Sequence, residues 1–258
     1  MQKNLHEIKH QKYNLEFGEV FNDSLENYKK IIWVAGLVFF ILTIIMVSIF
    51  MGVLTSIYGA SDFLSSMTEF SLLATTPSYL IVSSLFGVLI SIAISPLYAG
   101  IFQICHNAQT NKAFDLGTAF IHYKTSYFKQ IVISALLISL FTGIITDLIT
   151  VIGFQFIGTL FTYFMYFITL FTIPFIIFGN LNAVDAIKAS IAIVFKKFWI
   201  IFALMLVAFI LAMIGMIAIC IGIFFTLPII YSTQYEIYRA MIGVEENDEL
   251  DEIGIYNE

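Results

Sequence analysis

The sequence predicts an all-α, polytopic integral membrane protein with about six transmembrane helices. Hydrophobic residues make up 60% of the 258 residues and charged residues only 12%, and the mean hydropathy is +0.94. Soluble domains carry about 25% charged residues, so this composition is typical of a membrane protein. Several apolar runs also lack any charge over the roughly 18 residues that a bilayer crossing needs.

The predicted transmembrane domain occupies residues 31–241. Its six apolar runs cover residues 31–57, 79–104, 131–151, 155–178, 198–218 and 221–238. The last two belong to one long apolar stretch, so they form two spans only if the chain turns tightly near residues 219–222. Residues 1–30 are a polar cytoplasmic segment with an amphipathic helix, and no cleaved signal peptide is expected because the first apolar run begins too late. Residues 242–258 hold seven of the 18 acidic residues and are expected to form a disordered cytoplasmic tail.

The basic residues predict the orientation. With six spans, all 12 Lys and Arg residues fall on one side of the membrane, and the opposite loops contain only the acidic residues Asp62, Glu69 and Asp147. Cytoplasmic loops of membrane proteins are enriched in Lys and Arg. We therefore expect both termini to be cytoplasmic, in a bacterial cytoplasmic (inner) membrane.

Three prolines recur at equivalent places, one in each even-numbered span: Pro96, Pro174 and Pro228. Each has a hydroxyl residue one or two positions earlier: Ser95, Thr172 and Thr226. A proline inside a helix frees the carbonyl four residues back, and a nearby hydroxyl can satisfy it in lipid. The even-numbered spans are therefore predicted to be proline-kinked.

A helix-length amphipathic segment precedes each odd-numbered span, at residues 17–33, 114–132 and 183–201. In the third segment apolar residues recur at helical spacing, and Asn182 is placed to cap the helix with Asp185 in its first turn. The fold is thus predicted to contain three hairpins, each preceded by a cytoplasmic amphipathic helix.

The C-terminal part of the chain, residues 180–241, carries several short motifs. They are A-x-x-x-S from Ala186, K-x-F-W from Lys196, I-G-I from Ile221, T-L-P from Thr226, and the pair Tyr238–Arg239. With these motifs the segment, about a quarter of the chain, resembles a group of uncharacterised bacterial membrane proteins. They are similar to the membrane domain found beside some glycerophosphodiester phosphodiesterases. The resemblance implies a six-span fold of unassigned role and no phosphodiesterase activity, because the catalytic domain is absent from the sequence.

No pattern in the sequence indicates catalysis, a cofactor or a metal. Ionisable groups near the middle of a span mark transport or proton paths, and none is found. Asp147 and Glu236 lie near span ends, where interface-level solvated acids are expected. The four histidines, His6, His10, His106 and His122, lie in segments predicted to be cytoplasmic and are expected at the surface. Two isolated cysteines give no disulfide or zinc spacing.

Two sets of residues are candidates for packing or binding. Span two carries small residues at intervals of four: Ser83, Gly87, Ser91, Ser95 and Ala99. Such a ladder lets another helix approach closely, and the alternative is a polar strip along a solute path. Lysines at the cytoplasmic ends of the spans are candidate contacts for anionic lipid head groups: Lys29, Lys30, Lys129, Lys196 and Lys197.

The leading functional hypothesis is a non-enzymatic membrane protein that acts as an interaction or membrane-organising subunit. Its expected partners are the lipid bilayer, anionic lipids included, and a membrane or cytoplasmic protein, but not nucleic acid, because the sequence has no basic patch. The alternative is a transporter or channel for a small or lipid-like solute. A membrane enzyme acting on lipid has least support, and it would depend on His106, Asp147 or Glu236.

Overall fold

The computed structural model describes residues 15–58, 76–216 and 222–244, and all the secondary structure in these ranges is helical. The elements are α2 (Phe17–Tyr58), α4 (Pro77–Gln109), the 3-10 helix η1 (Gly117–Tyr123), α5 (Phe128–Val151), α6 (Gln155–Ile168), α7 (Thr172–Ile177), α8 (Ala183–Lys196), α9 (Phe198–Ile214), α10 (Gly222–Thr226) and α11 (Pro228–Ile242).

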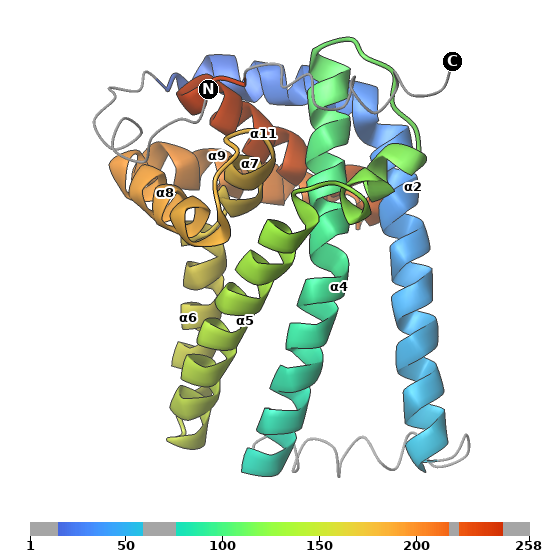
Figure 1. The fold of residues 1–258 in the computed structure, drawn as a ribbon, viewed down its shortest axis with the longest axis vertical. Helices are drawn as coiled ribbons and strands as arrows, with labels where there is room; N and C mark the ends of the chain where they lie inside the picture. The colour runs from blue at the N-terminus through green and yellow to red at the C-terminus, as the bar shows by residue number, and fades with distance from the viewer. Residues whose placement is uncertain (1–14, 59–75, 217–221, 245–258) are drawn as a thin grey trace.

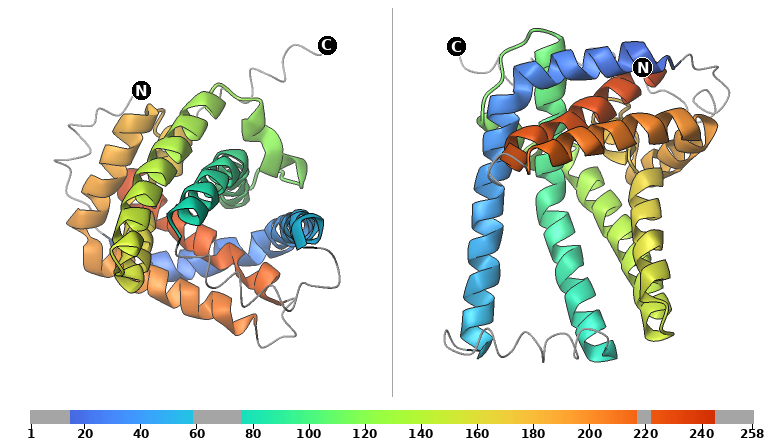
Figure 2. Two further views of the ribbon diagram at one scale, coloured as in Figure 1. Left: turned by 90° about the horizontal axis from the view of Figure 1, so that it is seen from below. Right: turned by 180° about the vertical axis from the view of Figure 1, so that it is seen from behind.

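The helices form two parts (Figure 1). Long segments of α2, α4, α5 and α6 run side by side. Toward one end α2 and α4 move apart, whereas hydrogen bonds still join α4 to α5 and α5 to α6 there. At the other end the N-terminal part of α2 and the helices α7 to α11 pack around the C-terminal end of α4, and several of them lie across the long helices (Figure 2). We call this second part the platform. Both the beginning of α2 and the end of α11 belong to it.

Four helical segments are long and apolar enough to cross a membrane: Phe17–Ile49, Pro77–Gln109, Phe128–Val151 and Gln155–Ile177. A fifth is present only if α8 and α9 count as one span, and these two helices meet at 96°. The predicted sixth span is not one helix, because α10 and α11 divide it and α11 begins at Pro228. Six spans are therefore not confirmed in the described part of the chain.

The amphipathic segments before the odd-numbered spans take three different forms. The first continues into the span within α2, and the third is the separate helix α8. Asn182 caps α8 as predicted, because its side chain accepts a hydrogen bond from the Asp185 amide at 3.0 Å. The second segment is wrong as a long helix: it folds into η1 and a turn. Close packing holds it there, since a Cβ on Gly100 of α4 would lie 2.0 Å from the Ala119 carbonyl oxygen.

The carbonyl groups freed by Pro96 and Pro174 find partners in two ways. In α4, which runs through Pro96 as one helix, Ser95 Oγ donates to the carbonyl of Ile92 at 3.1 Å, as the sequence predicted. Pro174 lies just after the break between α6 and α7, and the Leu170 carbonyl that it frees accepts instead from Gln234 Nε2 of α11. Thr172, predicted for that role, has a buried hydroxyl with no partner among the described residues. Thr226, predicted to act at Pro228, donates instead to the carbonyls of Ala212, Gly222 and Ile223.

Ser190 of α8 completes this break. Its fully buried hydroxyl accepts from the Phe171 amide at 3.0 Å and donates to the Ile168 carbonyl at 3.0 Å. A buried backbone group without a partner costs about as much as a lost hydrogen bond. The helix break next to Pro174 therefore depends on side chains from α8 and α11, which fix both helices against the end of α6.

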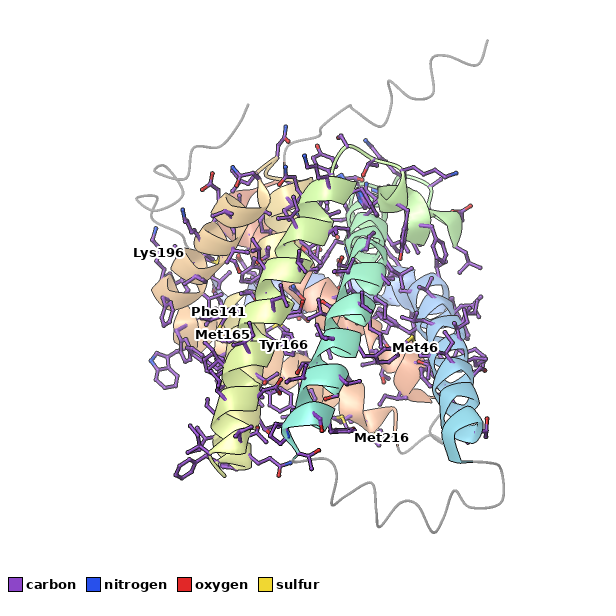
Figure 3. The ribbon with its side chains drawn as sticks, turned by 60° about the horizontal axis from the view of Figure 1, so that its bottom comes forward. Met46, Phe141, Met165, Tyr166, Lys196 and Met216 are labelled. Carbon is purple, nitrogen blue, oxygen red and sulfur yellow. The ribbon has the colours of Figure 1, made fainter. Side chains whose placement is uncertain are left out.

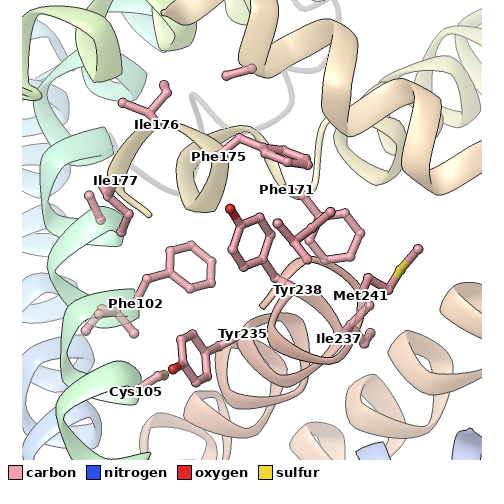
Figure 4. Packing of buried hydrophobic residues seen from close by; sticks show 14 of the residues in the cluster. Phe102, Cys105, Phe171, Phe175, Ile176, Ile177, Tyr235, Ile237, Tyr238 and Met241 are labelled. Carbon is pink, nitrogen blue, oxygen red and sulfur yellow. The ribbon is translucent and has the colours of Figure 1, made fainter. Parts of the chain in front are cut away.

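An aromatic cluster fills the space between α4, α7 and α11 (Figure 4). Tyr238 of α11 meets Phe175 of α7 edge-on, with ring centroids 5.1 Å apart, and Tyr235 meets Phe178 in the same way at 5.8 Å. Phe102 of α4 is also fully buried in this cluster. Edge-to-face aromatic pairs contribute about 0.5–1.5 kcal/mol each beyond the area that they bury, so this cluster helps to hold α7 and α11 together.

We expect Ser190→Ala to lower the free energy of unfolding by about 2 kcal/mol, because it leaves a buried amide and a buried carbonyl without a partner. The matched control is Ser83→Ala in α4, whose hydroxyl donates only to the Leu80 carbonyl of its own helix and is half-buried. Thermal unfolding of both variants in detergent measures the difference. Equal effects of the two substitutions would contradict the role assigned to Ser190.

Candidate functional site

The platform contains a partly buried polar cluster where α2, α4 and α11 meet. Its members are Asp23 and Asn27 of α2, Gln109 of α4, and Glu236 and Arg239 of α11. We call it the polar junction. Asp23 and Asn27 are four residues apart and Glu236 and Arg239 are three apart, so each pair lies on one side of its helix.

Glu236 is at the centre of the polar junction, with a side chain only 1% exposed. Its Oε2 accepts from Arg239 Nε at 2.5 Å, and its Oε1 accepts from Asn27 Nδ2 at 3.2 Å. Asn27 Nδ2 also donates to the Cys105 carbonyl of α4 at 2.8 Å. One amide group thus connects all three helices.

Arg239 joins two carboxylates across the helix boundary. Its Nη2 donates to Asp23 Oδ2 at 2.7 Å while its Nε holds Glu236. The Gln109 amide, oriented with its nitrogen 3.3 Å from Glu236 Oε1 and its oxygen 3.3 Å from Arg239 Nη2, bridges the two charged groups. Ser232 adds a further link, because its Oγ donates to the Ser24 carbonyl at 2.7 Å.

Burial dominates the electrostatics of the polar junction. It raises the pKa of Glu236 above the ordinary value for a glutamate, and the Arg239 guanidinium opposes this rise. Both carboxylate oxygens are occupied by donors from the chain itself. The arrangement therefore neutralises an internal charge and clamps α11 across α2 and α4.

The expectation that Glu236 is a solvated acid at the interface is wrong. The expected surface position is also wrong for two histidines. His106, 6% exposed, lies beside the polar junction with its Nδ1 3.0 Å from the Tyr235 hydroxyl. His122, 2% exposed, contacts Thr125 Oγ1 at 3.2 Å, and burial lowers its pKa to about 4. Both were placed in polar connecting segments by the sequence, but helix packing covers them.

Asp147, the third candidate, lies elsewhere. It belongs to α5, and its Oδ2 accepts from Ser84 Oγ of α4 at 2.6 Å. Next to it Thr146 and Thr162 join α5 to α6, with their hydroxyl oxygens 2.8 Å apart. Of the three residues on which a membrane enzyme would depend, the structure therefore brings His106 and Glu236 to one region and leaves Asp147 in another.

The small-residue ladder of α4 is buried only at its platform end. Ser95 and Ala99 are buried, Ser83 and Ser91 are half-buried, and a Cβ on Gly87 would have no atom within 4 Å. In the N-terminal half of α4 the neighbouring helix is α5. Its Asp147 and Gly143 lie against Ser84, which is not part of the ladder. Close helix packing along the whole ladder stays a prediction.

The candidate head-group lysines are placed unevenly. Lys29, Lys129 and Lys196 are exposed and Lys197 is half-exposed. Lys30 is exposed too, but its Nζ donates to the Ala108 carbonyl at 3.1 Å, near the end of α4. All five are therefore at least half-exposed, and Lys30 has a structural role in addition.

One signal in the sequence points to the polar junction. Arg239 is the only arginine of the chain and follows Glu236 at helical spacing at the end of an apolar run. Asn27 and Gln109 gave no such signal, because nothing in their local sequence distinguishes them from solvent-facing residues. Only the packing of α2 and α4 against α11 assigns them their role.

Comparison with known proteins gives no relative: no family model, no curated protein and no solved structure matches the chain. The resemblance to the membrane domain found beside some glycerophosphodiester phosphodiesterases stays a prediction.

We expect Arg239→Met to lower the free energy of unfolding by about 3 kcal/mol near neutral pH, because it leaves the buried Glu236 carboxylate without its counter-ion. Burial already raises the pKa of Glu236 above its unfolded value, and loss of Arg239 raises it further. A raised folded pKa means that stability is lost as the pH rises through it, so the defect should shrink as the pH falls toward 5.

Thermal unfolding of wild type and Arg239→Met at several pH values measures this dependence. The control is Asp23→Asn, which removes the more exposed carboxylate of the pair and should cost less at every pH. A defect of Arg239→Met that is the same at pH 5 and pH 8 would contradict the assignment.

Proposed function

We propose that the protein is a membrane-embedded, non-enzymatic subunit that organises or recruits other membrane components. The observation that carries the proposal is the contrast between the two parts of the fold. In the most apolar stretches of α2, α4 and α5 only 28%, 22% and 17% of the residues are buried within the chain, against 50% in the α6–α7 segment. Most residues in the apolar stretches of these three membrane-length helices are thus not buried within the chain.

Exposed apolar residues follow these helices along their length: Ile44, Ile45 and Val47 of α2, Ile81, Val82, Leu85, Phe86 and Leu89 of α4, and Phe141, Ile144 and Leu148 of α5. Away from the platform α2 and α4 also move apart (Figure 1). In water such a surface would drive association, and in a bilayer it is available to lipid or to the helices of a partner. The helices of the platform, by contrast, are held to one another by the polar junction and the aromatic cluster.

The proposed topology has four complete crossings, made by α2, α4, α5 and the α6–α7 segment, with the platform on the cytoplasmic side. Four crossings put both termini on the same side, as six would. The basic residues also remain together, because the chain between the predicted fifth and sixth spans carries no charge. The positive-inside rule therefore supports a bacterial cytoplasmic membrane with both termini inside, but it does not distinguish four spans from six.

Native mass spectrometry of the protein extracted gently from its own membrane tests the proposal. We expect a second membrane protein, or a defined set of phospholipids, to be retained at fixed stoichiometry. The matched variant is Leu85→Ser with Leu89→Ser, which makes the exposed side of α4 polar without touching the platform. Retention that this variant does not weaken would contradict a recruiting role for that side of α4.

Transport of a small or lipid-like solute is the second candidate, and the Asp147–Ser84 contact favours it. A carboxylate within a membrane-length helix is a mark of solute or ion paths, and here it lies between α4 and α5 beside the Thr146–Thr162 pair. The same experiment separates the two candidates. Retention of a single small solute, lost in Asp147→Asn, would overturn the recruiting role in favour of transport.

A further inference from the structure

Helix α9 is apolar on every side, although it lies in the platform. Its buried side, with Ile201, Leu204, Ala208 and Ala212, packs against the other platform helices. The opposite side exposes 43% of Phe202, 45% of Leu206 and 54% of Phe209. No residue from Phe198 to Ile214 is charged. A helix that is hydrophobic on every side is normally found in a protein core or in a membrane. The exposed side of α9 therefore requires an apolar environment.

The direction of α9 is unusual for such a helix. It meets α8 at 96°, and it runs across the long helices rather than along them (Figure 2). Lys196, just before α9, and Met216, just after it, mark its two ends in Figure 3. Its 17 residues span about 25 Å, short of the roughly 30 Å of a hydrocarbon core. Length and direction both fit a helix that lies within one leaflet.

The beginning of α9 has the chemistry of a membrane interface. Lys197 leaves the helical conformation, with φ −129° and ψ 35°, and so places two lysines at the corner between α8 and α9. Trp199, 78% exposed, and Phe195, 57% exposed, flank this corner. Tryptophan and lysine are the residues that anchor helices at the level of the lipid head groups, and lysine attracts anionic ones.

We propose that α9 lies in the plane of the platform-side leaflet, with its exposed side against acyl chains and the Lys196–Lys197 corner at the phosphates of anionic phospholipids. The inference rests on the proposed function, since it requires the four long helices to be embedded in the same bilayer. It makes α9 a lipid-binding surface of the platform and not a fifth crossing.

Tryptophan depth measurements test the position of α9, because the chain has only two tryptophans. Trp33→Phe leaves Trp199 as the single reporter at the start of α9. Adding Trp199→Phe and Phe209→Trp moves the reporter ten residues along α9. If α9 crosses the membrane, this places the reporter about 15 Å deeper in the bilayer. Each variant is reconstituted in vesicles that contain phosphatidylcholine brominated either near the head group or near the end of the acyl chain.

An in-plane helix predicts that both reporters are quenched more strongly by the shallow bromines than by the deep ones. A crossing helix predicts shallow quenching at position 199 but deep quenching at position 209, and that result would overturn the inference. The control is Leu89→Trp in the tryptophan-free background, an exposed site along α4 that should be quenched by the deep bromines. If neither lipid quenches this control, the membrane-embedded function fails as well.

The head-group contact is tested in nanodiscs of equal phosphatidylglycerol and phosphatidylcholine. We expect Lys196→Ser with Lys197→Ser to lose phosphatidylglycerol molecules that the wild type retains in native mass spectrometry. The matched control is Lys112→Ser with Lys124→Ser, which removes two exposed lysines from the connection between α4 and α5. Equal losses in the two double variants, or none in the first, would overturn the contact at the α8–α9 corner.

Discussion

The ion pair between Glu236 and Arg239 is the interaction on which the platform depends. An ionised carboxylate out of water costs several kcal/mol unless it is paired and hydrogen-bonded. Here α11 supplies both the charge and its counter-ion, while α2 and α4 supply the remaining donors and acceptors. If any of the three helices moved, a buried charge would lose a partner. The polar junction therefore restricts α2, α4 and α11 to one arrangement, a specificity that apolar packing alone provides less strongly.

The same reasoning explains how the platform tolerates broken helices. The Ile92 carbonyl freed by Pro96 accepts from Ser95, the residue just before the proline. The helix α4 therefore continues without a hydrogen bond from another helix at this point. At Pro174 and at the start of α11 the partners come from distant helices: Gln234 bonds the Leu170 carbonyl, and the Tyr28 hydroxyl donates to the Phe225 carbonyl at 3.2 Å. The helix breaks are therefore also the places where one helix is hydrogen-bonded to another. Polar side chains that satisfy the backbone at a break connect it to the next helix.

Charge and apolar surface are separated in the molecule. Arg239 pairs with Asp23 and Glu236 in the platform, and the large side chains exposed on α2, α4 and α5 are apolar. A chain built in this way has a polar base and a membrane part in which most residues of the apolar stretches are not buried within the chain. That division supports a role in which contacts with lipids or other proteins complete the membrane part.

The sequence by itself determined that the chain is helical, that several segments are long and apolar enough to cross a membrane, and where α8 begins. These features follow from composition, run length and local capping, as at Asn182, and do not depend on distant residues. The sequence predicted six such spans, and the described part of the structure has four, or five if α8 and α9 count as one. The tertiary structure alone decided the direction of α9, the division of the predicted sixth span and the burial of His106, His122 and Glu236. Hydropathy reports whether a segment leaves water but not which way its axis runs. A glutamate near the end of an apolar run likewise has the same local sequence whether it meets solvent or an arginine held between three helices.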